Sequence, residues 1–259
     1  MTIPDWLKLP EANEITDLND ASTTLLHAKI IQSKPFLKNL YRDFYKQFCG
    51  SLNGNTDSKL LVELGSGGGF IKDVIPNVVT SDVVRLPHID RHFSALNMPF
   101  ENNTVDAFFM INVLHHLKDS RAFFRELARS LKIGGKVVMV ESANTPWNRF
   151  IHINFHHEQF DIHGSWGFKE NGRLSGGNSA IPWIVFYRDK QKFLKEFPML
   201  KIKKIKLHTP FRFLISGGLT AIQLLPSWSY KTIRALEILL SPLNRYISMF
   251  MTVEIEKVA

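Results

Sequence analysis

Hydrophobic residues in the first part of the chain recur every three or four positions, the spacing of one face of an α-helix. The pattern is clearest at residues 22–48, where aromatic and aliphatic side chains alternate with polar ones. Pro35 lies within this stretch, and proline does not continue a helix, so two consecutive helices are predicted. Turn-forming residues at 51–58 then separate a helical cap, residues 1–57, from a second domain, residues 58–259.

Residues 59–142 alternate short apolar runs with helical patterns. The runs at 60–64, 77–82, 105–112 and 136–141 predict strands, and residues 119–131 carry one apolar helical face that ends before a glycine pair. This alternation is typical of βαβ units. We therefore predict an α/β fold with a Rossmann-like parallel sheet and helices on both faces.

The pattern changes after residue 142. Residues 143–189 are irregular and rich in histidine, tryptophan, asparagine and glycine. Residues 190–259 give a short helix, a basic strand at 201–208, an apolar helical insert at 210–247 and a last strand at 249–258. The second domain is thus divided into a core (59–142), a loop region (143–189) and a closing part (190–259).

Composition adds few constraints. Of 259 residues, 44% are hydrophobic and 22% charged, as in an ordinary globular protein, and Cys49 is the single cysteine, so no disulfide forms within the chain. The N-terminus lacks the basic start and apolar core of a signal peptide. The longest apolar stretch, residues 211–225, is shorter than the roughly 20 residues of a membrane-spanning helix. A cytoplasmic protein is expected.

The net charge of +8 is unevenly distributed. Residues 190–259 hold nine lysines and three arginines against four glutamates, so the rest of the chain is neutral overall. Such a region binds an anionic partner, or it is a solvated edge. We favour the second interpretation for Lys201, Lys203, Lys204 and Lys206, because lysines on an edge strand prevent unwanted strand pairing.

A glycine-rich turn, residues 65–69, comes directly after the first predicted strand and before a helical segment. Glycine accepts a positive φ and has no Cβ, so a ligand can approach the backbone closely. In an open parallel sheet the ligand binds at the carboxyl ends of the strands. Asp82 ends the second strand, where its carboxylate is placed to bind ribose hydroxyls. A nicotinamide dinucleotide and S-adenosylmethionine both meet these requirements.

Two residues favour S-adenosylmethionine. The dinucleotide fingerprint needs a third glycine at position 70, which is Phe70. Glu63 adds negative charge where a pyrophosphate would bind, and that charge suits a ligand with an ammonium and a sulfonium group. The alternative, a glycine-rich turn without any ligand, is disfavoured by the strand before it and by Asp82 after it.

Four blocks resemble, in order, the class I S-adenosylmethionine-dependent methyltransferases, particularly their small-molecule branch: residues 61–69, 79–82, 94–106 and 113–135. Ser94 stands where that family usually has an aspartate, and Ile133 where it has a proline. The resemblance implies that an antiparallel pair, 201–208 with 249–258, closes the sheet. It also implies S-adenosyl-L-methionine as cofactor, bound by the following residues: Glu63, Gly65, Ser66, Gly67, Gly69, Asp82, Ser94, Ala95 and Asn112.

Methyl transfer from a sulfonium requires alignment of the acceptor and exclusion of water, and a hydroxyl acceptor also benefits from a general base. Candidate bases follow the strand at 136–141: His152, His156, His157, Glu158, Asp161 and His163. We predict His156 or Glu158 as the catalytic residue, with His116 as the alternative. Adjacent residues on one element point apart, so His156, His157 and Glu158 do not form a metal site by spacing, and no metal ion is predicted.

The regions that flank the core select the acceptor. They are aromatic and apolar, and residues 147–187 are predicted to form the acceptor pocket. The expected partner is a small molecule, amphiphilic or anionic, such as a glycan- or lipid-linked intermediate, and any membrane contact would be peripheral. Two rivals stay open: an RNA methyltransferase that uses the basic C-terminal part, although no RNA-binding module accompanies it, and a cofactor-binding scaffold without turnover.

Overall fold

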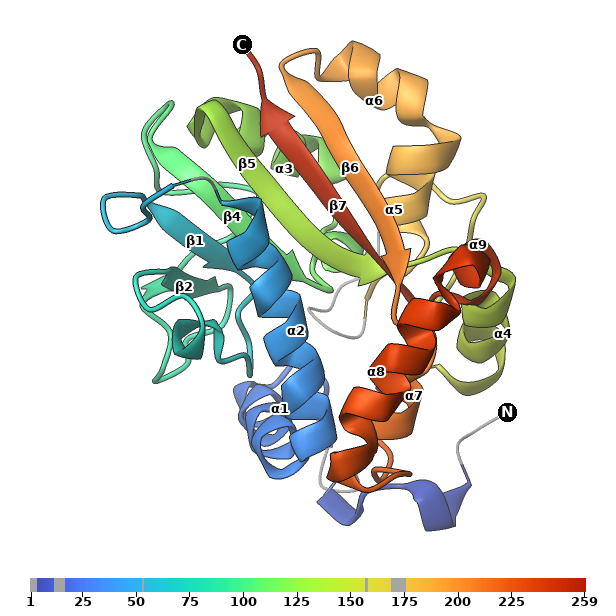
Figure 1. Cartoon of the computed structure of the whole chain (residues 1–259). Helices are drawn as coiled ribbons and strands as arrows, with labels where there is room; N and C mark the ends of the chain where they lie inside the picture. The colour runs from blue at the N-terminus through green and yellow to red at the C-terminus, as the bar shows by residue number, and fades with distance from the viewer. Residues whose placement is uncertain (1–3, 12–16, 53, 157, 169–175) are drawn as a thin grey trace.

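The centre of the molecule is one mixed β-sheet (Figure 1). The computed structural model describes residues 4–11, 17–52, 54–156, 158–168 and 176–259. Within them the strand order is β3-β2-β1-β4-β5-β7-β6. The strands have these bounds: β1 Leu61–Leu64, β2 Val79–Asp82, β3 Arg91–His92, β4 Val105–Ile111, β5 Leu131–Ser142, β6 Leu200–His208 and β7 Phe250–Lys257.

The sheet is parallel from β3 to β5 and antiparallel beyond it. β7 pairs antiparallel with β5 on one side and with β6 on the other. The predicted α/β fold, a Rossmann-like sheet closed by an antiparallel pair, is therefore confirmed, and β6 with its four lysines is an edge strand. β5 is longer than expected, since it begins at Leu131 directly after α3 and includes the glycine pair before which the helix was expected to end.

Helices cover both faces of the sheet. Besides short 3-10 and π turns, their bounds are α1 Ala21–Ser33, α2 Pro35–Ser51, α3 Ser120–Ser130, α4 Pro146–Phe155, α5 Ile181–Trp183, α6 Lys190–Glu196, α7 Arg212–Ser216, α8 Tyr230–Leu239 and α9 Asn244–Ile247. Side chains of β4 point alternately to the two faces. Phe108 packs with the face covered by α3, α5 and α6, whereas Phe109 stacks on Phe48 of α2 with ring centroids 5.0 Å apart.

The two N-terminal helices are confirmed, and their boundary lies at Pro35, the first residue of α2. α1 begins at an N-cap, Asp20, whose carboxylate accepts a hydrogen bond from the amide of Ser22. The helix expected after the glycine turn was a wrong prediction: only a 3-10 turn, Ile71–Asp73, lies there. Few residues separate the turn from β2, and α2 covers this face of the sheet instead.

A buried charge network joins the insert to α2. The guanidinium of Arg212 in α7 donates to Asp43 (2.6 Å) and to Glu237 of α8 (2.5 Å). Tyr230 donates its hydroxyl proton to the same Asp43 oxygen (2.8 Å). The other carboxylate oxygen of Glu237 accepts from the amides of Phe211 and Arg212. We call these four side chains, Asp43, Arg212, Tyr230 and Glu237, the insert network. Among the described residues, no helix has the length and apolar character needed to span a bilayer.

Candidate active site

A cavity of about 1240 Å³ lies at the carboxyl ends of the parallel strands. It is lined by the β1 turn, by the residues after β4 and by α1, α4 and the insert. Every residue that the sequence predicted for cofactor binding or catalysis lines this one cavity: Glu63, Gly65, Ser66, Gly67, Gly69, Asp82, Ser94, Ala95, Asn112, His156 and Glu158.

The turn after β1 is tightly packed. Gly65 has φ +64°, and a Cβ there would lie 2.6 Å from Val113, so a side chain is excluded by both strain and space. A Cβ on Gly68 would lie 2.6 Å from the backbone nitrogen of Ala28 in α1. The amide of Phe70 donates to the hydroxyl of Tyr45 in α2 (3.2 Å). The N-terminal helices thus form one wall of the turn.

Asp82 connects the turn to β2. Its Oδ2 accepts a hydrogen bond from the amide of Gly67 (2.9 Å), and its Oδ1 accepts from the amide of Val84 (2.9 Å). Each carboxylate oxygen has further lone pairs. The carboxylate therefore supports the turn and still faces the cavity.

Glu63 is a buried carboxylate at the closed end of the cavity. It is 3% exposed, and its Oε2 accepts no hydrogen bond from the described residues. Burial raises the pKa of Glu63 to about 8, and the nearby charge of Asp82 acts in the same direction, while a hydrogen bond from Ser66 opposes them. A buried carboxylate without a partner fits a positively charged ligand group, because unpaired buried charge is costly.

The other predicted cofactor residues lie on two further walls. Ser94 and Ala95 belong to the loop after β3, where the Ser94 hydroxyl accepts from the amide of Leu96 (3.2 Å). Asn112 follows β4 with φ +55°, a conformation unusual for a residue other than glycine. Backbone strain of this kind persists where the surrounding structure fixes it, commonly in binding sites.

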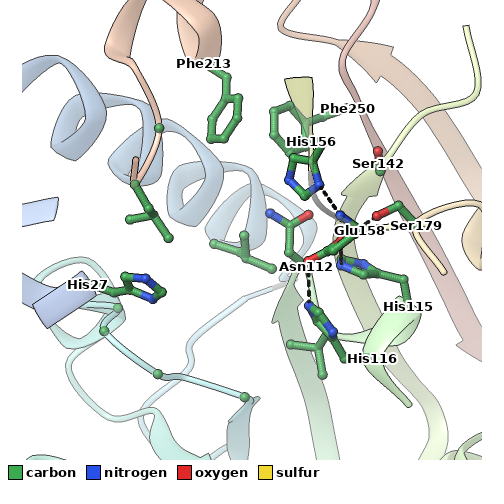
Figure 2. A pocket seen from close by; sticks show the side chains of 18 of the residues that line it. His27, Asn112, His115, His116, Ser142, His156, Glu158, Ser179, Phe213 and Phe250 are labelled. Atoms are coloured by element: carbon green, nitrogen blue, oxygen red, sulfur yellow. Dashed lines mark hydrogen bonds and ion pairs between the residues drawn. The ribbon is translucent and has the colours of Figure 1, made fainter. Parts of the chain in front are cut away.

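Three polar residues that line the cavity, His115, His116 and Glu158, lie together beside Asn112 and Ser179 (Figure 2), and the buried Glu141 lies behind them. We call His115, His116, Glu141 and Glu158 the histidine–glutamate cluster. The two histidines come from a 3-10 turn, Leu114–His116, directly after β4. Glu141 ends β5, and Glu158 follows α4.

Glu141 fixes His115. One Glu141 oxygen accepts from the amides of Val113 (2.8 Å) and Leu114 (2.7 Å), and the other contacts Nδ1 of His115 (2.7 Å). Burial lowers the pKa of His115, but the carboxylates of Glu141 and Glu158 outweigh it and raise the pKa to about 10. His115 is therefore held in one orientation, with Nε2 toward Glu158.

His116 is held by a different partner. Its Nδ1 lies 3.0 Å from the carbonyl oxygen of Gly176, and its Nε2 lies 3.4 Å from Glu158. Burial and the neighbouring charge of His115 lower the pKa of His116 to about 4. Because a carbonyl only accepts, the proton of neutral His116 is on Nδ1, and its Nε2 carries a lone pair.

Glu158 reaches the cluster because its loop is fixed to the segment before α5. Gln159 pairs with Asn178 in a parallel bridge, and the amide of Ser179 donates to the carbonyl of Gln159 (2.9 Å). The hydroxyl of Ser179 donates to Glu158 (2.6 Å). Burial raises the pKa of Glu158, but the charges of the nearby histidines, His115 first, hold it well below its usual range.

His156 lies at the cavity, exposed to solvent, with its ring 4.5 Å from that of His152. The amide of Glu158 donates to its Nδ1 (3.2 Å), so the proton of neutral His156 is on Nε2. Of the remaining candidates, His152 lines the cavity, and Asp161 and His163 do not. His157 lies outside the described residues.

Several cavity residues were not predicted as site residues. Thr24 and His27 of α1 line the cofactor end, and Ser179 contacts Glu158. Glu141 was recognised only as the end of a strand. The pair His115-His116 carried a usable signal, because it directly follows a parallel strand. Lys201, Lys203, Lys204 and Lys206 do not line the cavity.

Residues 62–139 match a family model described as a methyltransferase domain. No curated protein matches the chain. Among solved structures, a SAM-dependent methyltransferase from Archaeoglobus fulgidus is similar over 85% of this chain and 94% of its own, with a TM-score of 0.51 and 14% identity. Phosphoethanolamine N-methyltransferase 2 from Haemonchus contortus, in complex with S-adenosyl-L-methionine, is similar over 97% of this chain and 60% of its own (TM-score 0.50, 13% identity). At these identities the structural likeness establishes the fold.

Proposed function

We propose that this chain, whose residues 62–139 match a methyltransferase domain, uses S-adenosylmethionine to methylate a hydroxyl group of an amphiphilic small molecule, such as a glycan- or lipid-linked intermediate. The observation that supports the proposal most is the single cavity with two chemically different ends. One end is formed by the glycine turn, and the other by the histidine–glutamate cluster.

The cofactor end has groups for each part of S-adenosylmethionine. Glu63 offers a buried carboxylate to the cationic methionine portion, and the turn at residues 65–69 allows close approach. Asp82 faces the cavity where the ribose hydroxyls would bind, and Ser94 and Ala95 would contact the adenine. Asn112, between the two ends, would position the methionine portion. We assign the cofactor site to these residues together with Ser66, Gly67 and Gly69.

At the other end the acceptor hydroxyl would lie beside Glu158, which we assign as the catalytic residue with His156. Of the two, Glu158 is placed nearer the cluster, because its carboxylate faces both histidines, whereas Nδ1 of His156 already accepts from an amide. Transfer then forms one C–O bond and breaks the C–S bond of the cofactor. Closure of the site by α1 and the insert would exclude water, so we assign residues 1–57 as a cap.

The amphiphilic character of the acceptor is inferred from the walls. α4 and the insert line the cavity with apolar side chains. These are Trp147, Ile151 and Phe155 from α4, and Leu214, Leu219 and Leu224 from the insert. The insert also exposes apolar side chains outside the cavity, with Trp228 80% exposed and Leu239 75% exposed. Clusters of this kind mark contact with apolar ligands or surfaces.

The proposal is tested first by calorimetry with S-adenosylmethionine and S-adenosylhomocysteine. Asp82→Ala should weaken binding by about 1–3 kcal/mol, through loss of hydrogen bonds to a charged group. Gly65→Leu should abolish binding, and Asp57→Ala, an exposed change far from the cavity, is the matched control. Tight binding of NAD without affinity for the methyl donor would contradict the assignment.

An acceptor screen with methyl-labelled cofactor then separates the substrate classes. Lipid-linked glycans, free sugars and short RNAs are incubated with the enzyme at low and high salt. Label in the lipid-linked fraction supports the proposal. Label in RNA, with binding that falls steeply as salt rises, would support an RNA methyltransferase instead. Cofactor binding without transfer to any class would indicate a non-catalytic scaffold.

A further inference from the structure

Three side chains of the histidine–glutamate cluster offer ligand atoms to one small volume of the cavity (Figure 2). One such atom from each of His115, His116 and Glu158 lies within 4.8 Å of the other two. The two Nε2 atoms lie 3.4 Å from different oxygens of Glu158. This distance is long for an N–H···O hydrogen bond, for which about 2.7–3.2 Å is usual. It is close to the spacing of two ligand atoms around a zinc ion, about 3.3 Å for bonds of about 2.0–2.1 Å, with each histidine opposite its own carboxylate oxygen.

Both histidines already have the outer partners that metal-bound histidines require. Nδ1 of His115 contacts the Glu141 carboxylate (2.7 Å), and Nδ1 of His116 contacts the Gly176 carbonyl (3.0 Å). These partners accept, so they place a proton on each Nδ1. The Nε2 of neutral His116 then offers its lone pair directly, and a metal would displace the Nε2 proton of His115, as metal binding to protonated ligands requires. Donation of the second ring N–H to a carboxylate or carbonyl is the usual support of a metal-bound histidine, and it fixes the ring orientation.

The charges of the cluster also fit a cation. Glu141 is fully buried, His115 is 4% exposed, and Glu158 lies against both histidines. Buried carboxylates are normally paired with cations or coordinate metals. A divalent ion between the two histidines and Glu158 would balance the negative charges of Glu141 and Glu158 with both imidazoles neutral.

We propose that His115, His116 and Glu158 bind a divalent transition-metal ion, best matched by Zn²⁺, with a fourth position open to the cavity. Two imidazoles, one carboxylate and an open position are the ligand set of many catalytic zinc sites. The inference rests on the proposed function, because the acceptor hydroxyl would occupy the open position. A metal held there would lower the pKa of the hydroxyl, which would release its proton to solvent before the site closes. The oxygen then bonds to the methyl carbon as the C–S bond breaks, giving the methyl ether and S-adenosylhomocysteine. Glu158 is a ligand in this account and not the base.

The site is tested on the full chain with metal alone. Protein stripped with a chelator is titrated with ZnCl₂ by calorimetry, and bound zinc is counted by elemental analysis. We expect about one zinc per wild-type chain. His116→Gln and Glu158→Gln should lose it, while Glu141→Gln should bind about 10–100-fold more weakly because the support of His115 is altered. His163→Gln, which changes an exposed histidine outside the cavity, should bind zinc as the wild type does.

Two further measurements keep the result independent of folding and of turnover. Co²⁺ should give the visible absorption of a tetrahedral site in the wild type and in His163→Gln only. S-adenosylhomocysteine is titrated into every sample, so that loss of the cofactor site is seen separately. Equal zinc binding by the wild type and by both ligand variants would overturn the metal site. Full transfer by the chelated enzyme would also overturn it while leaving the proposed function intact. Zinc binding without cofactor binding would contradict the proposed function alone.

Discussion

Two clusters of buried charge in this molecule look alike in composition and differ in how their hydrogen bonds are satisfied. In the insert network, Arg212 lies between Asp43 and Glu237 at hydrogen-bonding distances, and Glu237 also accepts from two backbone amides. In the histidine–glutamate cluster, the contacts of Glu141 are short, but those of Glu158 with the two histidines are 3.4 Å. The first cluster joins helices to each other, whereas the second faces the cavity.

The difference shows that burial of charge does not by itself mark a functional site. A saturated network holds elements in place, and its groups have little capacity left for a ligand. A ligand-binding site, in contrast, contains polar groups that are not fully satisfied within the protein. This lowers stability, and the rigid structure around the site maintains the arrangement. By this criterion we infer that the insert network has a structural role and the histidine–glutamate cluster a functional one. The four predictions below test this distinction, from the largest expected effect to the smallest.

Replacement of Arg212 should cause the largest loss of stability. Arg212→Leu leaves the buried Glu237 without its cation and leaves Asp43 with the 3.4 Å contact of Arg234 as its ion pair, and breaking a buried ion pair by removing one partner costs about 3–5 kcal/mol. Urea unfolding followed by circular dichroism measures the change. Arg245→Leu, at an exposed arginine next to Tyr246, is the control and should change the unfolding free energy by less than about 0.5 kcal/mol. A small effect at Arg212 would remove the distinction between the two clusters.

Replacement of Glu158 should lower activity strongly and stability little, the reverse of the effect expected at Arg212. Glu158→Gln keeps the size of the side chain and removes its charge, so turnover on the acceptor should fall about 10²–10⁴-fold, the usual contribution of a positioned base, with a loss of this order also expected for a metal ligand. The unfolding free energy should fall by less than in Arg212→Leu, because glutamine can still accept from the Ser179 hydroxyl and the contacts with the two histidines are 3.4 Å long. A loss of stability as large as that of Arg212→Leu would place Glu158 in a structural network.

Glu63 gives a third case to compare with the two clusters, because one of its carboxylate oxygens is buried and accepts no hydrogen bond from the described residues. Its pKa is raised to about 8 in the folded chain, so the protonated form is favoured by folding. Stability from this group is full below pH 4.5, where the unfolded chain also binds the proton, and is lost as the pH rises through 8. Ionisation of this group lowers the free energy of unfolding by at most about 1.4 kcal/mol per pH unit.

Thermal unfolding without cofactor therefore compares the wild type with Glu63→Gln between pH 5 and pH 8. The wild type should lose stability relative to the variant over this interval, and the variant should bind cofactor poorly. Parallel curves for the two proteins would show that Glu63 is not a charge held for a ligand.

The lysines of β6 should give the smallest effect on the folded state. Lys201, Lys203, Lys204 and Lys206 lie on an edge strand and outside the cavity. Their joint replacement by glutamine should leave cofactor affinity unchanged and lower solubility, because an unprotected edge pairs with other chains. Light scattering and calorimetry measure the two properties. Unchanged solubility with lost binding to anionic vesicles or RNA would indicate a partner surface.

Much of the fold was predictable because its signals are local. A short apolar run and an apolar helical face identified β4 and α3, and Pro35 set the boundary between α1 and α2. The turn at residues 65–69 identified the cofactor end of the cavity for the same reason. The helix expected after that turn was wrong, since local spacing does not reveal that α2 covers this face.

The histidine–glutamate cluster was predictable only in part. Glu158 was identified, but its partners come from the turn after β4 and from the end of β5, distant in sequence. Sequence spacing relates only residues that are neighbours along the chain, and for this reason no metal site was predicted. Which lone pairs are left unused depends on the Glu141 and Gly176 contacts, and these appear only in three dimensions.

The position of β7 has a consequence for the order in which the protein is made. β7 follows β6 in the chain but lies between β5 and β6 in the sheet. A ribosome therefore releases β5 and β6 before the strand that joins them exists. Until residues 250–257 emerge, the apolar inner strand β5 has an open edge, and open edges are where nascent chains aggregate. The sheet is completed only after translation of β7, and a nascent chain stalled within residues 209–249 should engage chaperones that bind exposed strands.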